Sequence, residues 1–341
     1  MKLIDKSKPV MVTGATGYVA GVLVKKLMAE GLCVHATIRD TQNLDKLRYL
    51  NRIAQTSNGS IKYFKADLLD IGSFEEAMKD CELVYHTASP FITVVNDPQK
   101  NLVDPALIGT RNVLLSANKT TAVKRIVLTS SCVAILGDAK DLLQLPNRIA
   151  TEAHWNDTSN LYHQSYSYAK TLAEKEAWKI NKAQDRWDLV VINPSLVFGP
   201  GINPVSTSES FRIMKQFGDG TMKSGVPKFE IGMVDVRDVA LAHFKAGFNP
   251  EAKGRHIISA ESKSFLQLSL ILQNEFGEKY PLHKREIPKF LVWLLAPVVG
   301  LKRKMVRKNI GYVWLVDNTK SKKELNMKYT PIKKSIIDHF Q

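Results

Sequence analysis

The stretch VTGATGYVA at residues 12–20 decides the fold. It closes the apolar run 9–13, which predicts a buried strand, and opens the segment 18–31, whose apolar residues recur at helical spacing. Gly14 and Gly17 allow a tight turn and let the backbone approach a phosphate closely. The following helix N-terminus offers free N–H groups and the positive end of a dipole. Strand, turn and helix in this order predict a dinucleotide-binding turn.

Short β-branched runs alternate with helical segments over the first 200 residues. Strands are predicted at 33–38, 61–66, 83–88, 125–130 and 189–194. Helices are predicted at 42–55, 73–80, 99–119 and 166–183. This alternation predicts an α/β fold, a Rossmann-type doubly wound parallel sheet with helices on both faces. Beyond residue 200 the pattern becomes mainly helical, which predicts a smaller C-terminal substrate cap.

Arg39 follows the predicted second strand, where a dinucleotide site distinguishes between ribose hydroxyls and a 2′-phosphate. A guanidinium at this place favours the phosphate through bidentate, charge-assisted hydrogen bonds. Asp40 comes one residue later and is expected to point elsewhere. We therefore predict NADP(H) rather than NAD(H), with a simple surface-loop role for Arg39 as the alternative.

Tyr166 and Lys170 stand four residues apart at the start of a predicted helix and therefore share one face of it. Tyr168 points about 160° away from Tyr166, since each helical residue turns about 100°. A phenol is a weak acid at neutral pH, and a neighbouring ammonium lowers its pKa. The pair suits proton transfer to or from an alcohol oxygen. One face of an ordinary amphipathic helix is the competing interpretation.

Thr129, Ser130 and Ser131 lie at the carboxyl end of a predicted parallel strand, where ligands of open α/β sheets bind. A serine hydroxyl there can hydrogen-bond a substrate oxygen. Serines at strand ends are also ordinary turn formers. No Asp/His partner of a catalytic triad accompanies them, so a serine hydrolase is not expected.

The composition is that of a soluble globular protein, with 341 residues, 44% apolar and 24% charged. The net charge of +15 arises partly from basic runs at 301–308 and 320–324. Such runs are usually solvated faces, although they also attract nucleic acid or anionic lipid. Because no recognisable nucleic-acid module accompanies them, no nucleic-acid partner is expected.

The most apolar run, FLVWLLAPVVGL at 290–301, contains Pro297 and is too short to span a bilayer. We predict a buried cap helix and no stable membrane insertion, with contact of Lys302, Arg303 and Lys304 with lipid headgroups as the alternative. The three cysteines are scattered and show no metal-binding spacing. Apolar packing explains them, so we expect no metal and a reducing, cytoplasmic location.

These motifs together resemble the extended short-chain dehydrogenase/reductases, and most closely the branch of dihydroflavonol reductases and methylglyoxal (aldehyde) reductases. The resemblance covers most of the chain to about residue 260. It is carried by TGATGYVA, ATIRD, KADLLD, HTASPF, VKRIVLTSS, YSYAKTLAEKEAWK, INPSLVFGP and VDVRDVALAH.

The resemblance implies a catalytic set of Ser131, Tyr166 and Lys170. Tyr166 would protonate the carbonyl oxygen, Lys170 would lower the pKa of Tyr166 and hold the nicotinamide ribose, and Ser131 would orient the carbonyl. The remaining cofactor contacts that it implies are Gly14, Thr16, Gly17, Tyr18, Val19, Arg39, Lys46, Asp67, Leu68, Thr87, Ala88, Ser89, Pro194 and Val197. Without the family, Asp67 is a plain strand-end cap and Pro194 a strand terminator.

Two departures from neighbouring branches narrow the expected chemistry. Ala106 stands where sugar-nucleotide epimerases usually carry an Asn, which favours reduction. The tyrosine segment lacks the Asn-Trp-Tyr-Cys-Tyr signature of cinnamoyl-CoA reductases, so a CoA thioester substrate is not supported.

The long connection 138–165 leads to the tyrosine helix and is expected to contribute to substrate binding. His154, Trp155 and His163 are candidate substrate contacts there, and Phe91 is a further candidate pocket wall. A lone histidine is more often structural, and Phe91 is equally compatible with a core position.

We expect residues 1–200 to form an NADP-binding Rossmann domain, with 229–260 contributing, and 201–228 and 261–341 to form the substrate-binding cap. The expected activity is NADPH-dependent reduction of an aldehyde or ketone, reversible as an alcohol dehydrogenase, with a small-molecule substrate and a monomeric or homodimeric protein. Alternatives are a hydroxysteroid-type NAD(P)-dependent dehydrogenase, a sugar-nucleotide epimerase and a non-catalytic NADP-sensing regulator, the last opposed by the retained Tyr–Lys pair.

Overall fold

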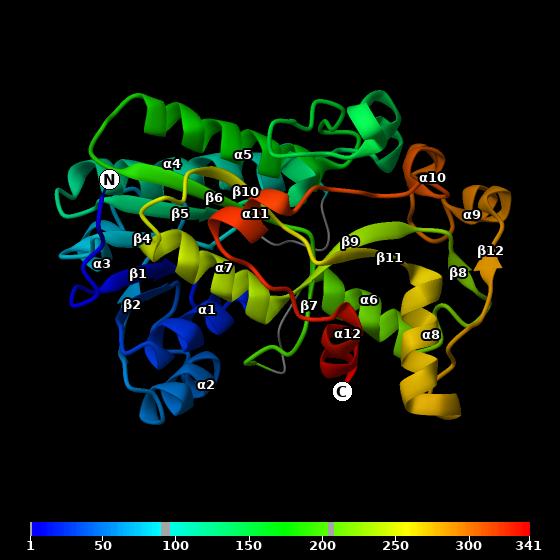
Figure 1. Ribbon diagram of the computed structural model, residues 1–341, viewed down its shortest axis with the longest axis horizontal. Coiled ribbons are helices and arrows are strands. Elements are labelled where there is room, and N and C mark those ends of the chain that lie inside the picture. Colours follow the sequence, from blue (N-terminus) through cyan, green and yellow to red (C-terminus); the bar gives the residue numbers. More distant parts are fainter. Residues whose placement is uncertain (1, 90–95, 204–207) are drawn as a thin grey trace.

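A seven-stranded, wholly parallel sheet forms the centre of the molecule (Figure 1). The computed structural model describes residues 2–89, 96–203 and 208–341. The strands lie in the spatial order β10 (Gly254–Ile258), β6 (Asp188–Pro194), β5 (Arg125–Thr129), β4 (Leu83–His86), β1 (Val10–Thr13), β2 (Cys33–Ile38) and β3 (Ser60–Lys65). The chain order reverses between β1 and β4, where ligands of such sheets bind. The predicted doubly wound sheet is confirmed.

Helices cover both faces of this sheet. One face carries α1 (Tyr18–Ala29), α2 (Leu44–Gln55) and α7 (Val236–Phe248). The other carries α3 (Glu75–Met78), α4 (Asp104–Lys119) and α5 (Ser165–Lys182). A π-helical turn, η1 (Gln99–Val103), precedes α4.

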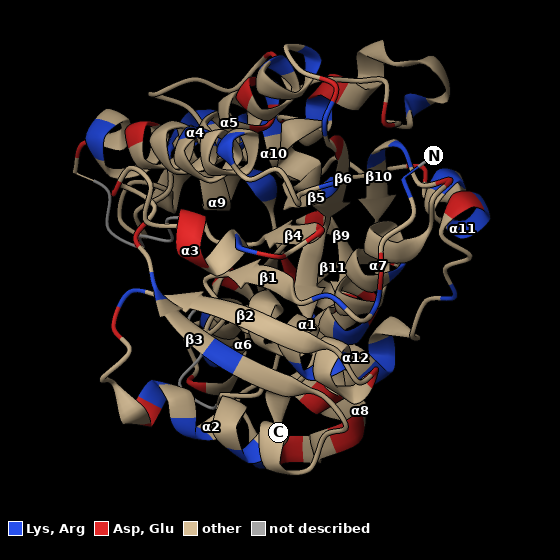
Figure 2. Cartoon of the chain, turned by 90° about the vertical axis from the view of Figure 1, so that its left-hand side faces the viewer, with Lys and Arg blue, Asp and Glu red and all other residues tan. Residues whose placement is uncertain are grey.

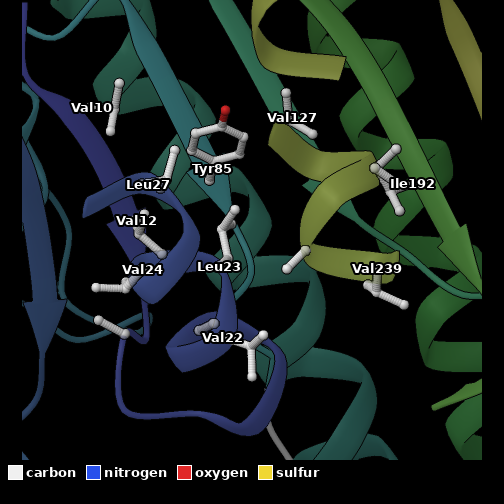
Figure 3. Packing of buried hydrophobic residues seen from close by; sticks show 14 of the residues in the cluster. Val10, Val12, Val22, Leu23, Val24, Leu27, Tyr85, Val127, Ile192 and Val239 are labelled. Carbon is white, nitrogen blue, oxygen red and sulfur yellow. The ribbon is translucent and has the colours of Figure 1, made fainter. Parts of the chain in front are cut away.

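Alternate residues of each central strand enter opposite cores, as the pleat requires. Val10 and Val12 of β1 pack beneath α1, against Leu23 and Leu27, while Met11 faces the other layer (Figure 3). Because helices cover both faces, β1 and β4 are buried along their whole length and read in the sequence as apolar runs without alternation.

The C-terminal half adds a three-stranded sheet and a short two-stranded one. The first has the order β11 (Glu261–Ser264), β9 (Glu230–Asp235) and β7 (Leu196–Phe198). The second pairs β12 (Glu286–Ile287) with β8 (Val226–Pro227). The helices here are α6 (Glu209–Gly218), α8 (Phe265–Phe276), α9 (Lys289–Leu295), α10 (Arg303–Asn309), α11 (Thr319–Glu324) and α12 (Ile332–Phe340). Short helical turns are η2 (Cys132–Ala134), η3 (Ala139–Gln144), η4 (Pro146–Arg148) and η5 (Gly277–Lys279).

The last helix returns to the beginning of the fold. His339 of α12 places Nδ1 2.8 Å from the carbonyl oxygen of Gly199, in the turn after β7. The same carbonyl accepts a hydrogen bond from the Tyr18 hydroxyl at 2.6 Å. One backbone carbonyl therefore joins the first helix, the turn after β7 and the last helix.

The prediction of a buried cap helix at 290–301 is wrong. Helix α9 ends at Leu295, and most apolar side chains of this run are exposed, whereas Val292 and Ala296 are buried. The cysteines behave as predicted in part: Cys81 and Cys132 are buried, Cys33 is half-buried, and all three are free.

Candidate functional site

The glycine turn fits a dinucleotide phosphate. Gly14 has φ +63°, and a Cβ there would lie 3.0 Å from the Ala88 Cβ, so only glycine fits without strain. Gly17 is the N-cap of α1 and makes no side-chain cap, and the first helical turn carries no acidic residue. The N–H groups at the start of α1 are therefore available to an anion.

Thr13, which sequence reasoning missed, joins this turn to the segment after β4. Its Oγ1 accepts hydrogen bonds from the backbone N–H groups of Thr87 at 3.0 Å and Ala88 at 2.9 Å. The Thr13 hydroxyl also lies 3.0 Å from Nδ1 of His86, whose pKa burial lowers to about 3, with the Lys170 charge adding to the effect. A neutral His86 can accept a hydrogen bond from the Thr13 hydroxyl. The predicted cofactor segment Thr87–Ser89 is thus held beside Gly14, and the only signal was a threonine preceding the turn.

Tyr18 and Val19 open α1, but the Tyr18 side chain faces the C-terminal half. Its ring is buried and packs edge-on against Phe211 with ring centroids 5.1 Å apart. Burial raises the pKa of the Tyr18 phenol, so the hydroxyl stays protonated as donor to Gly199. Of Tyr18, only the backbone is therefore placed to contact a cofactor at the start of α1.

Arg39 and Lys46 are exposed cations in the segment that leads from β2 into α2. Arg39 directly follows β2 and is exposed, and Lys46 is exposed in the first turn of α2, where Figure 2 shows basic segments. Neither side chain forms an ion pair within the described residues. Asp40 instead accepts a hydrogen bond from the backbone of Gln42 at 2.9 Å. Its carboxylate is therefore engaged locally, as expected.

Asp67 and Leu68 follow β3 and are half-buried. The Asp67 carboxylate accepts from the backbone N–H of Leu69 at 2.9 Å, which is the strand-end cap considered from the sequence. The Leu68 carbonyl accepts from the Asn112 side chain at 2.8 Å. Gly109 lets α4 approach, since a Cβ there would lie 3.0 Å from the Leu68 Cβ.

Lys170 is anchored at the carboxyl end of β5. Its side chain is buried, and Nζ donates to the Thr129 carbonyl at 3.3 Å. Desolvation lowers the pKa of Lys170 to about 8, although the Glu174 carboxylate acts in the opposite direction. This ammonium is therefore close to its titration point at physiological pH.

Tyr166 lies one turn before Lys170 and is 42% exposed. Desolvation raises the pKa of Tyr166 to about 12, with Glu209 of α6 acting in the same direction, and the remaining exposure means that water screens part of this effect. The direction is opposite to the lowering expected from Lys170. The phenol makes no hydrogen bond within the part of the chain that the structure describes. Tyr168 packs against the apolar cluster of Leu102 and Ala106, away from Tyr166.

Ser131 caps η2 immediately after β5. Its Oγ accepts from the Val133 N–H at 3.3 Å and lies 3.4 Å from the carbonyl oxygen of Pro194, to which it donates. Pro194 ends β6 and is buried, while Val197 of β7 is half-buried. The end of β5, which the resemblance assigns to the substrate carbonyl, and the end of β6, which it assigns to the nicotinamide, are therefore in contact.

Glu174 is a second residue that sequence reasoning missed. It lies one helical turn after Lys170 and is fully buried. Its carboxylate accepts from Arg255 Nε at 2.6 Å, from Asn193 Nδ2 at 2.8 Å and from the Ser130 hydroxyl. The four-residue spacing from Lys170 was a signal, but Arg255 lies 81 residues away in sequence.

A small cavity of about 20 Å³ is lined in part by Lys170. It is bounded by the ends of β4 and β5 and by α4 and α5. The lining residues are Leu68, His86, Ala88, Ser89, Ala106, Thr110, Leu128, Thr129, Ser130, Lys170, Ala173 and Glu174.

The loop residues predicted to contact substrate are engaged elsewhere. His163 is buried with Nε2 2.8 Å from the Asp138 carboxylate and so anchors the loop. Its contact with substrate stays a prediction. Trp155 stacks on the Arg255 guanidinium, 3.9 Å from the ring centroid, and His154 Nδ1 accepts from the Thr151 N–H at 3.0 Å. Phe91 lies outside the described residues.

The described residues contain no group of three or more His, Cys, Asp or Glu side chains suited to a metal ion. Within the same ranges, no helix combines the length and apolar character that crossing a membrane requires.

Comparison with known proteins gives consistent matches. Residues 10–259 match the model of the NAD dependent epimerase/dehydratase family. The chain is 35% identical to cinnamoyl-CoA reductase CAD2 of Medicago truncatula, covering 96% of this chain and 93% of that protein. It is 32% identical to dihydroflavonol 4-reductase of Gerbera hybrida, covering 81% and 75%. The structure of yeast methylglyoxal/isovaleraldehyde reductase Gre2 complexed with NADPH has a TM-score of 0.77 and 28% identity, covering 97% and 96%.

Proposed function

We propose that this chain, which belongs to the NAD dependent epimerase/dehydratase family of extended short-chain dehydrogenase/reductases, is an NADPH-dependent carbonyl reductase. The resemblance seen in its sequence is confirmed, and the chain is an oxidoreductase that uses a nicotinamide dinucleotide. The preference for NADPH, the aldehyde or ketone substrate and the roles of the residues are proposed.

The burial of Lys170 at the carboxyl end of β5 is the observation that carries this proposal. The hydrogen bond from Nζ to Thr129 holds α5 across the strand end, two residues before Ser131. It also places Tyr166 one turn earlier on the same helical face. An acid, a cation and a hydroxyl donor would thereby meet at the carboxyl ends of the strands, where the glycine turn lies.

In the proposed reaction a carbonyl and NADPH plus one proton yield an alcohol and NADP⁺. When bound, the reduced nicotinamide supplies a hydride to the carbonyl carbon. Ser131 Oγ donates a hydrogen bond that orients the carbonyl oxygen. As the carbon–oxygen π bond breaks, Tyr166 Oη gives its proton to that oxygen and becomes a phenolate. Solvent then reprotonates Tyr166.

The raised pKa of Tyr166 keeps the phenol protonated at neutral pH, which a proton donor requires. The Lys170 ammonium, one turn away, would stabilise the phenolate as it forms. Lys170 would also donate to the ribose hydroxyls of the nicotinamide half, and its burial leaves its N–H groups with little competition from water.

Support for NADPH comes from Arg39, directly after β2, and Lys46, in the first turn of α2, which are exposed and form no ion pair within the described residues. Both would hold the 2′-phosphate, with Arg39 bidentate. Asp40, the residue after Arg39, accepts a hydrogen bond within its own loop through one carboxylate oxygen, which favours a local role over contact with a ribose.

The test follows consumption of NADPH and NADH by absorbance against a panel of aldehydes, diketones and flavanonols, with cinnamoyl-CoA and a UDP-sugar as separate arms. We expect turnover of a free aldehyde or ketone with NADPH, and much slower turnover with NADH. Turnover of cinnamoyl-CoA and of no free aldehyde or ketone would show that the substrate is a CoA thioester. Epimerisation of the sugar without net cofactor consumption would contradict reduction.

A further inference from the structure

The segment from α9 to the start of α10 exposes an apolar patch made of Phe290, Trp293, Leu294, Leu295, Val298, Val299 and Leu301. Val298 is 84% exposed and Leu294 55%. Single exposed apolar residues are ordinary, but a contiguous group of this size marks a surface that binds something. In Figure 1, α9 and α10 lie at one end of the long axis, remote from β1, β2 and β3.

This exposure belongs to an ordered segment. Val292 and Ala296 are buried and pack with Val306 and Ile310 of the following helix and turn. Val292 and Ala296 lie one turn apart and face inward, whereas the patch residues of α9 and of the turn that follows it are exposed. The fold therefore fixes the apolar patch on the surface.

Basic side chains border the apolar patch. Lys302, Arg303 and Lys304, here called the basic rim, are all exposed, and none forms an ion pair within the described residues. The Arg303 guanidinium lies 4.3 Å from the centroid of the Trp293 ring, which links rim and patch. Over residues 284–308 a single acidic residue, Glu286, accompanies eight basic ones: Lys284, Arg285, Lys289, Lys302, Arg303, Lys304, Arg307 and Lys308.

We propose that the apolar patch and the basic rim bind the surface of an anionic phospholipid bilayer. Apolar side chains with a tryptophan, flanked by lysine and arginine, match the boundary between acyl chains and negatively charged headgroups. Because the three residues of the basic rim form no ion pair within the described residues, the surface complements an anionic one. It does not complement itself, which disfavours a second copy of this chain as the occupant.

The surface also approaches the entrance to α5. Lys302 Nζ donates to the carbonyl of Tyr162 at 2.7 Å, and Tyr162 is 82% exposed. Tyr162 precedes Tyr166 by four residues. Binding through the rim would therefore place the loop before α5 close to the lipid headgroups. This inference concerns a surface separate from the proposed reaction and does not depend on it.

The apolar patch is tested by flotation of the full-length protein with vesicles of phosphatidylcholine alone or mixed with phosphatidylserine. We expect binding to the mixed vesicles that weakens as salt is added. The double variant Leu294→Ser/Val298→Ser should lose about tenfold or more in binding, because less apolar area enters the interface. Leu69→Ser/Ile71→Ser is the matched control, since these residues are 54% and 80% exposed, and it should bind like the parent.

The charge contribution is tested separately with Arg303→Gln/Lys304→Gln, whose side chains are exposed and should leave the fold intact. About 1 kcal/mol per basic residue near an anionic surface corresponds to a loss of about tenfold or more. Lys322→Gln/Lys323→Gln on α11 removes the same charge elsewhere and should bind like the parent.

Three results would overturn the proposal. The first is equal binding to neutral and anionic vesicles. The second is an equal loss in the two charge variants, which would reflect net charge alone. The third is a dimer in sedimentation that the patch variant dissociates, without vesicle binding, which would assign the patch to self-association.

Discussion

The guanidinium of Arg255 lies 2.6 Å from the carboxylate of Glu174, and both side chains are buried. Arg255 belongs to β10 at the sheet edge, and Glu174 to α5, one turn beyond Lys170. The pair therefore fixes α5 against the sheet and supplies the negative charge that keeps the pKa of Lys170 from falling further.

Removing the charge of Glu174 should destabilise the protein. In Glu174→Gln the Arg255 cation stays buried without a counter-ion, and we expect a loss of about 3 kcal/mol in the free energy of unfolding, measured with urea. Glu30→Gln breaks the surface pair with Lys26 and should cost less than about 0.5 kcal/mol. Equal losses in the free energy of unfolding would show that the buried pair contributes no more stability than the surface pair.

Replacing Tyr166 with phenylalanine should remove the proton donor and leave the cofactor site in place. We expect turnover to fall by about 10²-fold or more, while NADPH affinity, measured by fluorescence titration, stays within about twofold. Tyr168→Phe is the matched control, since Tyr168 packs away from the site, and it should remain active. An inactive Tyr168→Phe beside an active Tyr166→Phe would move the donor to Tyr168.

Replacing Arg39 with alanine should weaken the binding of NADPH much more than the binding of NADH. Loss of a bidentate contact with a phosphate should increase the Kd for NADPH by about tenfold or more and leave the Kd for NADH nearly unchanged. Arg52→Ala, an exposed arginine near the end of α2, is the control. Equal losses for both cofactors would reject the 2′-phosphate role.

The pH dependence should report the titration of Lys170. Its depressed pKa of about 8 means that the ammonium is present below that pH and lost above it. The kcat/KM for NADPH, which reflects the free enzyme, should therefore be level near neutrality and fall as pH rises through about 8. In Glu174→Gln the fall should begin at lower pH, because Glu174 raises the pKa of Lys170. A profile that stays level to about pH 10 would contradict this assignment.

Gly14→Ala should damage the turn more than an equivalent change elsewhere. A left-handed φ costs a non-glycine residue about 1–2 kcal/mol, and the added Cβ would also press on Ala88 at 3.0 Å. Gly31 has φ +82° with nothing within 4 Å, so Gly31→Ala isolates the backbone cost. Thermal unfolding should show the larger loss in Gly14→Ala, and only that variant should bind NADPH more weakly.

Local patterns were sufficient to predict the central sheet. Each buried strand is a short apolar run, and the strand–turn–helix at residues 12–20 carries its own signal, so β1, α1 and the position of Gly14 followed from adjacent residues. The placement of Tyr166 and Lys170 one turn apart on α5 was predictable for the same reason, because it depends only on helical spacing.

Contacts between distant segments were not predictable in this way. The Arg255–Glu174 pair depends on β10 joining the sheet edge, and the Thr13 bonds depend on β4 lying beside β1. At residues 290–301 the sequence predicted burial that the structure does not show. Their hydropathy indicated a buried helix, but only Val292 and Ala296 are buried against the rest of the protein.

The junction at Gly199 has a consequence for biosynthesis. His339 and Tyr18 meet at this one carbonyl although 321 residues separate them. During translation the β1–α1 turn emerges first, and its wall toward the C-terminal half is completed only after residue 339 has left the ribosome. Until α12 has been synthesised, the rings of Tyr18 and Phe211 in the nascent chain therefore lack their packing partner His339.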